Sequence, residues 1–563
     1  MNEYPVLRLA RTRKSAAGAA ALVFAGIAAL SMSACADTIS VSRDETLDVS
    51  TATTVSAMDV HGTLNVQGTL ATPAEITVDP NSTTVSLGTD SGDNAVINIG
   101  DYGRIEGGQY TIGGANGIGG FVVGGKRKGN ATWYQYSNAH LASGQITLST
   151  DATSDARVID ILTLNEGAYA GIKETNWSGS YQAIVNRSTQ ADARVLFNGG
   201  VLVFFSCGHP YIFFSSHHSG TSFSNIVPDG EGGKAIVLEG VNGKPVEIHV
   251  GGGERGFYPF QGKTCFRGSG DVVLHGPRSG IPVIWIFNYT ATDLWAQNGD
   301  LRLTGGMSMS IRANNCLPRA STNGIVQVLG NSFSHLDLYG KTNTVNGLVV
   351  AGEASLTNSV EGVAQLVLGS VVPNGVLSVA KVGGGPIEVV KRGTGTLTVT
   401  NTPSFPSMCV ESGTALFKDD DCTLGSLDVN SAASITVDGC TLSLGAANVS
   451  SAKIQVNRGA TLDGSGVMGG LAISNLTVDC SIGGGSIANF RPVQNGVLNL
   501  TGIVGEQPGR YVASETISSV VDGSNLTSWR VAVDGTIVKG SAVTIDNGNL
   551  VAHLTNGLII SVR

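Results

Sequence analysis

Charged residues are scarce in this chain, at 14% of 563, and acidic residues outnumber basic ones by 43 to 34. The formal net charge is −9, and the charges are scattered along the chain rather than collected in blocks. A mildly acidic surface offers no electrostatic attraction for phosphate groups. We therefore expect no nucleic-acid partner.

Helical periodicity is also missing, because apolar residues do not recur every three to four positions. Short runs rich in Val, Ile and Thr end instead at Gly, Asn or Asp, which favour turns. Examples between residues 54 and 100 are TVSAMDV, GTLNV, EITV and AVINIG. The gaps are too short for crossover helices, and 77 residues are glycine. This pattern predicts an all-β chain whose strands stack in parallel as a solenoid.

The cysteines lack the CxxC spacing that is typical of zinc sites, so the sequence predicts no metal site. Seven of the eight cysteines follow Cys35, and four of them crowd between Cys409 and Cys480. An oxidising compartment allows disulfides, and stacked strands can bring Cys422 and Cys440 within bonding reach. The pairing stays open at this point.

Motifs of catalysis are missing as well. The Gly-His-Gly signature of polygalacturonase-like hydrolases does not occur, and the nearest match, at 207–210, is Cys-Gly-His-Pro. The acidic run 419–421 is typical of a solvated turn rather than a metal site. The sequence therefore assigns no catalytic, cofactor-binding or metal-binding residue, and we expect no cofactor.

Residues 1–36 have the pattern of a bacterial export signal. A basic stretch, 8–14, precedes an apolar stretch, 16–30, that is too short to span a membrane comfortably. Two endings are open. Either the chain is cleaved at the A-x-A sequence around Cys35, or residues 32–35 form a lipobox and Cys35 is acylated. No other stretch of the sequence is long and apolar enough to cross a membrane.

Aromatic residues concentrate between 130 and 300. Continuous apolar runs such as VLVFF at 201–205 indicate buried strands. Other aromatic and histidine side chains are candidates for stacking on sugars and for polar contacts with a glycan. The candidate glycan-binding residues are Trp133, Tyr134, Tyr136, His217 and His218.

The repeated strand-and-turn pattern of the sequence becomes more regular after Leu336. The stretch from Val389 to Val399 reads VVKRGTGTLTV, and GATLDGSGVMGG follows from Gly459. Together with LDLYGKTNTVNGL and QLVLG, these segments resemble the autotransporter-associated β-strand repeat of bacterial surface and secreted proteins. The resemblance covers roughly residues 336–470.

This resemblance implies a pectin-lyase-like, right-handed parallel β-helix with one strand per sheet in each coil. We expect a divergent β-helix at 37–335, a repeat-like β-helix at 336–497 and a small C-terminal β cap at 498–563. Autotransporters end in a membrane β-barrel, and the residues after Gly470 are too few for one. We therefore expect a passenger-like body without the translocator barrel.

The expected function is that of an exported, non-enzymatic surface protein in adhesion or glycan binding. The expected partner is a polysaccharide or a cell-surface glycan, and the only expected membrane attachment is a lipid at Cys35. The expected location is the outer membrane or cell surface as a lipoprotein, or the medium as a secreted chain. A polysaccharide lyase or glycoside hydrolase is the first alternative, since β-helices include both. A structural protein of the cell envelope is the second.

Overall fold

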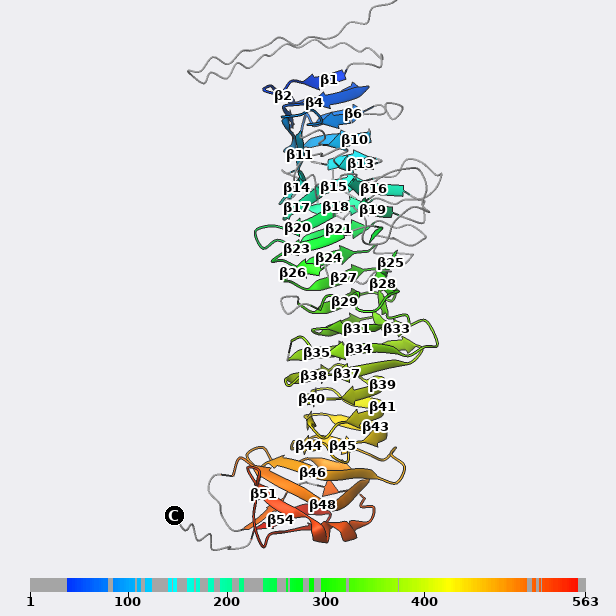
Figure 1. Cartoon of the computed structure of the whole chain (residues 1–563), viewed down its shortest axis with the longest axis vertical. Coiled ribbons are helices and arrows are strands. Elements are labelled where there is room, and N and C mark those ends of the chain that lie inside the picture. Colours follow the sequence, from blue (N-terminus) through cyan, green and yellow to red (C-terminus); the bar gives the residue numbers. More distant parts are fainter. Residues whose placement is uncertain are drawn as a thin grey trace, which may run out of the picture. The chain divides into compact units, whose positions relative to one another are not determined.

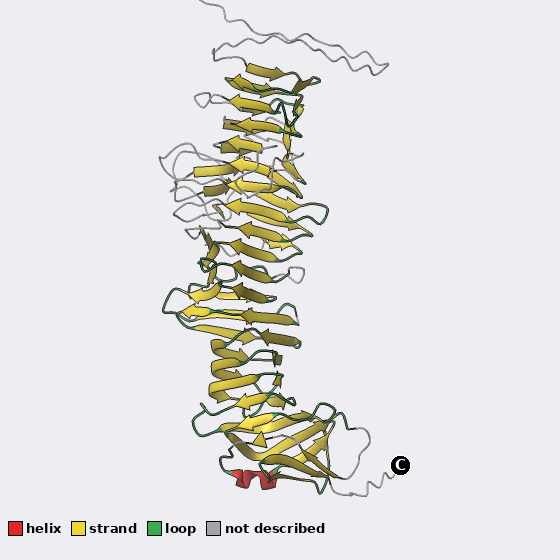
Figure 2. Cartoon of the chain, turned by 180° about the vertical axis from the view of Figure 1, so that it is seen from behind, coloured by secondary structure: helices red, strands yellow, loops and turns green. Residues whose placement is uncertain are grey.

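The computed structural model describes residues 38–554 and leaves out several segments within that range. The segments left out are 79–84, 107–108, 113–116, 124–139, 144, 149–158, 167–168, 173–180, 187–192, 205–211, 217–235, 251–259, 262–263, 277–282, 288–294, 320–323, 373, 504–508, 513–515 and 518. The described part is nearly all β-structure, with one short 3-10 helix, η2 (Gly523–Ser528) (Figure 2). The prediction of an all-β chain of parallel strands is thus confirmed.

The chain forms two compact units. The first consists of Met1–Asn176, Gln182–Phe205 and Ser215–Ile236, and the second of Trp177–Tyr181, Ser206–Phe214 and Val237–Arg563.

The described strands of the first unit form three parallel sheets. The first sheet comprises β1 (Thr38–Val41), β4 (Ala57–Val60), β7 (Val85–Leu87), β10 (Gln109–Ile112), β13 (Gln145–Leu148) and β16 (Tyr181–Asn186). The second comprises β2 (Thr46–Val49), β5 (Thr63–Val66), β8 (Asn94–Ile99), β11 (Ile118–Val123), β14 (Ile159–Asn165) and β17 (Ala193–Asn198). The third comprises β3 (Thr53–Val55), β6 (Ala74–Val78), β9 (Gly103–Glu106), β12 (His140–Ser143), β15 (Tyr169–Ile172) and β18 (Val201–Phe204). Each strand therefore pairs with the third strand that follows it in the chain (Figure 1).

The register of these strands stacks apolar side chains in rows. Leu64 of β5 pairs with Ile97 of β8, which pairs with Phe121 of β11, which pairs with Leu162 of β14. All four side chains are buried. Because side chains alternate between the two faces of a strand, one such row fixes the inward face of the whole sheet.

Polar side chains form a second row on the outward face of the same sheet. Asn65 donates a hydrogen bond to Asp48 at 2.7 Å, and Asn98 donates one to Asn65 at 2.8 Å. Each bond joins two neighbouring strands, so the outer row ties the stack together as the inner row does.

The second unit is built from parallel sheets in the same way. Its longest sheet comprises β21 (Val246–Val250), β24 (Val272–His275), β27 (Leu301–Gly305), β29 (Val326–Gly330), β32 (Leu348–Gly352), β35 (Gly375–Val379), β38 (Thr396–Thr400), β40 (Gly413–Lys418), β42 (Ala433–Asp438), β44 (Lys453–Val456), β46 (Leu471–Asp479), β48 (Phe490–Thr501) and β51 (Arg530–Val533). Another comprises β31 (Thr342–Val345), β34 (Ala364–Leu368), β37 (Ile387–Lys391), β39 (Ser404–Val410), β41 (Cys422–Val429), β43 (Thr441–Asn448), β45 (Thr461–Asp463), β47 (Ser486–Ala488) and β50 (Thr516–Ile517). The strands β20 (Ile236–Gly240), β23 (Thr264–Gly268) and β26 (Trp295–Gln297) are neighbours in that order. A separate five-stranded sheet holds β25 (Val283–Phe287), β28 (Met307–Ile311), β30 (His335–Asp337), β33 (Ser355–Asn358) and β36 (Val382–Gly384). The remaining parallel strands are β19 (Ile212–Ser216) and β22 (Phe260–Gln261).

Apart from isolated bridges at Asn165–Gly199 and Asn457–Gly484, the antiparallel pairing among the described strands lies near the end of the described chain. β52 (Thr536–Ile537) pairs antiparallel with β51, and β54 (Asn549–Leu554) pairs antiparallel with β49 (Gly509–Val512) and β53 (Ala542–Asp546). The strands that precede this antiparallel region still pair in parallel, as β48 does with β46.

The repeat-like motif occupies a corner between two sheets. Its two β-prone halves are strands β37 and β38, as their composition predicts, but they belong to different sheets and do not form a hairpin. Between them, Lys391 is completely buried, and Nζ donates hydrogen bonds to the carbonyl oxygens of Arg392 and Gly393, both at 2.7 Å. Arg392 points outward and holds both carboxylate oxygens of Glu411 at 2.8 and 3.1 Å. The lysine of the motif is therefore a structural part of the corner.

Candidate functional site

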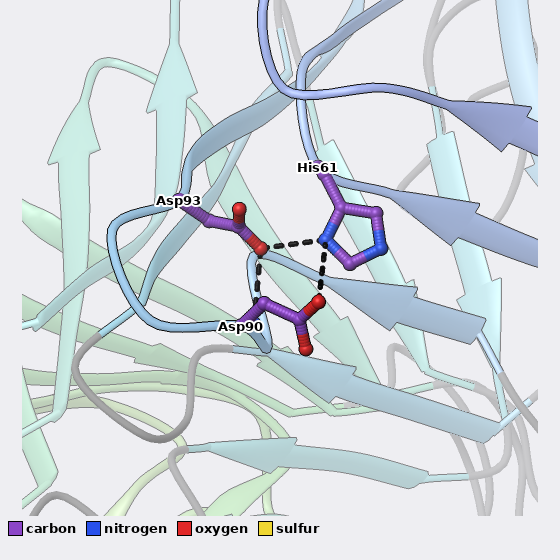
Figure 3. A group of neighbouring side chains, drawn as sticks. All are labelled: His61, Asp90 and Asp93. Atoms are coloured by element: carbon purple, nitrogen blue, oxygen red, sulfur yellow. Dashed lines mark hydrogen bonds and ion pairs between the residues drawn. The ribbon is translucent and has the colours of Figure 1, made fainter.

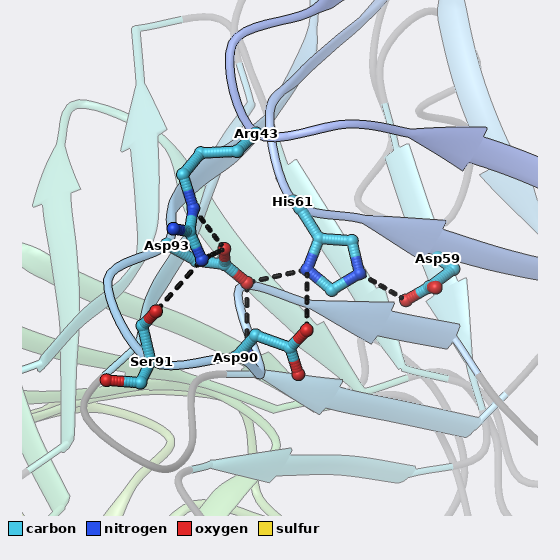
Figure 4. Close-up of polar contacts among 6 residues, drawn as sticks. All are labelled: Arg43, Asp59, His61, Asp90, Ser91 and Asp93. Carbon is cyan, nitrogen blue, oxygen red and sulfur yellow. Dashed lines mark hydrogen bonds and ion pairs between the residues drawn. The ribbon is translucent and has the colours of Figure 1, made fainter.

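A cluster of titratable groups in the described residues lies where turns leave the first sheet of the first unit. Val60 of β4 pairs with Leu87 of β7, so the turns that follow these two strands are neighbours. His61 opens the first of these turns, and residues 88–93 form the second. A third turn, between β1 and β2, contributes Arg43 (Figure 4).

Backbone hydrogen bonds fix the turn 88–93. Gly88 N–H donates to the carbonyl of Val60 at 2.8 Å, and Asp93 N–H donates to the carbonyl of Asp90 at 3.1 Å. Gly92 has φ +84°, a left-handed conformation that glycine adopts without steric cost. The turn thus folds back on itself and brings the side chains of Asp90 and Asp93 to the same side as His61 (Figure 3).

Asp93 is the anchor of the cluster, and its side chain is fully buried. One carboxylate oxygen, Oδ1, accepts hydrogen bonds from Nε and Nη2 of Arg43 at 3.0 and 2.9 Å. The other, Oδ2, lies 2.6 Å from Nδ1 of His61 and accepts the backbone N–H of Asp90 at 2.9 Å. Burial alone would raise the pKa of Asp93, but the bonds from His61 and Arg43 outweigh it and lower the pKa.

His61 lies between two carboxylates. Nδ1 faces Asp93, and Nε2 lies 3.2 Å from Oδ1 of Asp59. The hydrogen bond to Asp93 raises the pKa of His61 above its usual value, against a smaller opposing effect of burial. A histidine with both ring nitrogens turned to carboxylates has no free nitrogen with which to take a proton from a substrate, so this arrangement does not suit a general base.

The same atoms form a ligand set. Nδ1 of His61 and carboxylate oxygens of Asp90 and Asp93 all lie within 4.8 Å of one another. Asp90 is the solvent-exposed member of the set, because its side chain is 71% exposed and its Oδ2 lies 3.8 Å from Nδ1 of His61. The arrangement can therefore hold either a proton between His61 and Asp93 or a cation among the three groups.

A second group of carboxylates lies in the second unit and is tied to the backbone. Asp271 Oδ1 accepts the N–H of Asp300 at 2.8 Å, and Asp300 Oδ1 accepts the N–H of Ile325 at 3.0 Å. Arg302 Nη2 lies 2.8 Å from Asp271, and Gln327 also bonds Asp300. Both carboxylates join turns of neighbouring strands, so we assign this group a structural role.

The acidic run 419–421 does not converge on one point. Asp420 Oδ2 accepts hydrogen bonds from the N–H of Asn401 at 2.9 Å and from Thr400, and Asp421 Oδ1 accepts the N–H of Thr441. All three aspartates are exposed. The prediction of a solvated turn is confirmed.

The residues predicted to contact a glycan lie outside the described part of the chain, as does the predicted lipidation site. These are Trp133, Tyr134, Tyr136, His217, His218 and Cys35. Of the apolar run 201–205, Val201, Leu202 and Val203 are described and buried, as expected for a core strand.

The cluster around His61 was missed by reading motifs along the sequence, since its members are far apart and match no short spacing. One signal could have found it. His61 follows the strand AMDV and the segment DSGD follows the strand VSL, so aligning successive strands of one sheet places both turns side by side.

No protein-family model matches this chain, and no curated protein sequence matches it. Among the described residues, no helix has the length and apolar character needed to cross a membrane.

Proposed function

We propose that this chain is an exported right-handed parallel β-helix of the autotransporter-repeat type, which presents its outward faces for adhesion or glycan binding. The observation that supports this most is the return of the chain to the same sheet at every third strand of the first unit. Connections between parallel strands of one sheet are right-handed in nearly all proteins, which favours the right-handed sense.

The rows of stacked side chains support the proposal of a non-enzymatic scaffold. Apolar rows fill the inside, and on the outward face of the second sheet the row Asp48, Asn65 and Asn98 presents amides and a carboxylate at the regular strand spacing of about 4.8 Å. Amide and hydroxyl groups at a fixed spacing are suited to hydrogen bonding with the hydroxyls of a polysaccharide. A scaffold of this kind needs no catalytic residue, and the carboxylates of Asp93, Asp271 and Asp300 are engaged in bonds that join neighbouring turns.

The test uses the chain from Asp37 onward with plant, mucin and uronate polysaccharides, with and without calcium. Co-sedimentation measures binding, and new reducing or unsaturated chain ends measure cleavage. We expect binding without cleavage. New chain ends would overturn the non-enzymatic role in favour of a lyase or hydrolase, and the absence of both binding and cleavage would favour a structural envelope protein.

A matched pair of variants locates the binding face. The triple variant Trp133→Ala, Tyr134→Ala and Tyr136→Ala removes the candidate stacking residues, and we expect it to lose most of the binding. Phe333→Ala is the control, because Phe333 is a 39% exposed aromatic residue outside the candidate segment. Equal binding by the two variants would exclude the 133–136 segment.

The proposed attachment to the membrane rests on Cys35. In cells that express the full chain, acylation would place a labelled fatty acid on the protein and hold it in the membrane fraction. We expect Cys35→Ala to lose both the label and the membrane association. A wild-type chain without the label would instead be a freely secreted protein.

A further inference from the structure

We propose that His61, Asp90 and Asp93 form a binding site for a single zinc ion (Figure 3). Zinc is bound in proteins by histidine nitrogen and carboxylate oxygen, with three protein ligands and water completing a tetrahedral site. This cluster supplies one nitrogen and two carboxylates, from turns that follow two neighbouring strands. The inference does not depend on the proposed glycan binding.

The distances fit a tetrahedral ion after small movements. Two ligand atoms bound to one zinc ion lie about 3.3 Å apart, since each bond is about 2.0–2.1 Å long. Nδ1 of His61 lies 2.6 Å from Oδ2 of Asp93 and 3.8 Å from Oδ2 of Asp90, on either side of that value. Binding therefore requires His61 and Asp93 to separate by about 0.7 Å and the exposed side chain of Asp90 to approach His61 by about 0.5 Å.

The groups behind the ligands point to a metal more strongly than the ligands alone. A histidine that binds a metal through one nitrogen commonly donates the other N–H to a carboxylate, which fixes the ring. Asp59 occupies that place, with Oδ1 3.2 Å from Nε2 of His61 (Figure 4). Arg43 fixes the orientation of the second ligand, Asp93. It donates two hydrogen bonds to Oδ1 and leaves Oδ2 directed at His61.

The charge and the ligand types select among cations. Asp59, Asp90 and Asp93 carry three negative charges and Arg43 one positive charge, so the site offers a net charge of about −2 to a divalent ion when His61 is neutral. Calcium takes six to eight oxygen ligands and magnesium keeps most of its water, whereas imidazole favours zinc. The cluster therefore suits zinc better than either alkaline-earth ion.

The test is isothermal titration of the whole chain, freed of metal with a chelator, with zinc chloride. Because the chain contains other histidines, the result is read as the difference between variants. We expect His61→Gln and Asp90→Asn each to bind one zinc ion fewer than the wild type. Asp59→Asn, which only loses the bond to Nε2, should keep the site and weaken it by about tenfold.

His553→Gln is the matched control. His553 bonds Thr544 at 2.8 Å in the C-terminal antiparallel sheet of the second unit and is not one of the proposed ligands, so its loss should leave the zinc stoichiometry unchanged. Circular dichroism verifies that each variant is folded. A crystal grown with zinc should show an anomalous peak between His61 and Asp93. Unchanged zinc binding in both His61→Gln and Asp90→Asn, or a site that calcium fills equally well, would overturn the proposal.

Discussion

The Nδ1 atom of His61 lies 2.6 Å from Oδ2 of Asp93, although 32 positions separate the two residues in the chain. The pairing of β4 with β7 brings their turns together, and Arg43 completes a chain of charge-assisted bonds from a third turn. Bonds of this kind between ionised groups are stronger than those between neutral ones. Asp93 therefore links three successive turns through a single buried carboxylate.

Replacing Asp93 with asparagine should loosen these turns. The amide keeps the shape but presents N–H groups to a neighbour that is itself a donor, at a cost of about 2–3 kcal/mol. Hydrogen–deuterium exchange followed by mass spectrometry should show faster exchange in β4 and β8. Asp90→Asn is the control, because this side chain is 71% exposed and its replacement should cost less than about 0.5 kcal/mol. Equal protection in the two variants would contradict the anchoring role of Asp93.

Lys391 is the second residue whose replacement should be costly. Its Nζ donates to the carbonyls of Arg392 and Gly393. Methionine at this place would remove both bonds and leave the Gly393 carbonyl only the 3.4 Å bond from Ser412 Oγ. We expect Lys391→Met to destabilise the second unit by about 1–3 kcal/mol. The measurement is the urea midpoint from far-ultraviolet circular dichroism. A neutral effect would mean that water replaces the ammonium group.

The same lysine predicts a pH dependence. Burial lowers the pKa of Lys391, so the unfolded chain holds this proton more tightly than the folded one. Stability rises with pH wherever the unfolded state binds more protons, here from the lowered folded pKa up to the unfolded value of about 10.4. The wild type should therefore gain stability relative to Lys391→Met as pH is raised from 7 to 10. A difference that shrinks over this range would contradict the lowered pKa.

Alanine substitutions at two glycines can distinguish the cost of backbone strain from the cost of steric crowding. Gly413 and Gly459 have nearly the same left-handed φ, +75° and +78°. A methyl group on Gly413 would lie 2.5 Å from the carbonyl oxygen of Gly395 and 2.9 Å from Nζ of Lys391, whereas one on Gly459 would meet nothing within 4 Å. We expect Gly459→Ala to cost about 1 kcal/mol from strain alone.

Gly413→Ala should cost at least about 1 kcal/mol more than Gly459→Ala, because the added methyl group must also displace the corner around Lys391. The difference between the two urea midpoints measures this crowding. Equal midpoints would show that the corner around Lys391 rearranges to fit the methyl group. Gly413 would then be needed only for its left-handed φ angle.

The strands of the repeat-like segment could be predicted because their signal is local. Val, Ile and Thr on either side of a glycine-rich turn indicate two strands wherever the turn lies in the fold. Lys391 ends strand β37 and is buried, whereas Arg392, the first residue after the strand, is exposed. That the inward one is a lysine held by carbonyl groups could not be predicted, because those carbonyls are ordered by the corner itself.

The cluster around His61 could not be predicted for a different reason. Its contacts depend on the register between β4 and β7, and a shift of one residue would turn every side chain to the opposite face. The register is set by buried side chains such as Val60 and Leu87, which pair across the strands. The sequence shows those apolar residues, but nothing in their local order states which strands are neighbours.

Cys409, Cys422, Cys440 and Cys480 are free thiols in this structure, which bears on the disulfide that an exported chain could form. Cys422 pairs in register with Leu442 rather than with Cys440, so the two cysteines are offset along neighbouring strands. Both are buried. Burial, and then the nearby charge of Cys440, raises the pKa of Cys422 to about 12, and burial raises the pKa of Cys316 to about 11.

These pKa values and the burial of the thiols predict which cysteines react first with iodoacetamide at pH 8. The thiolate is the reactive form, and Cys316 and Cys422 are both buried and protonated at that pH. Cys409 and Cys480 are only half-buried and should be labelled first, with Cys316 and Cys422 labelled only after unfolding. Peptide mapping of the purified chain, alkylated before and after denaturation and without reducing agent, gives the order. A Cys422–Cys440 disulfide in the map would contradict the free thiols, because it would require the offset between the two strands to close.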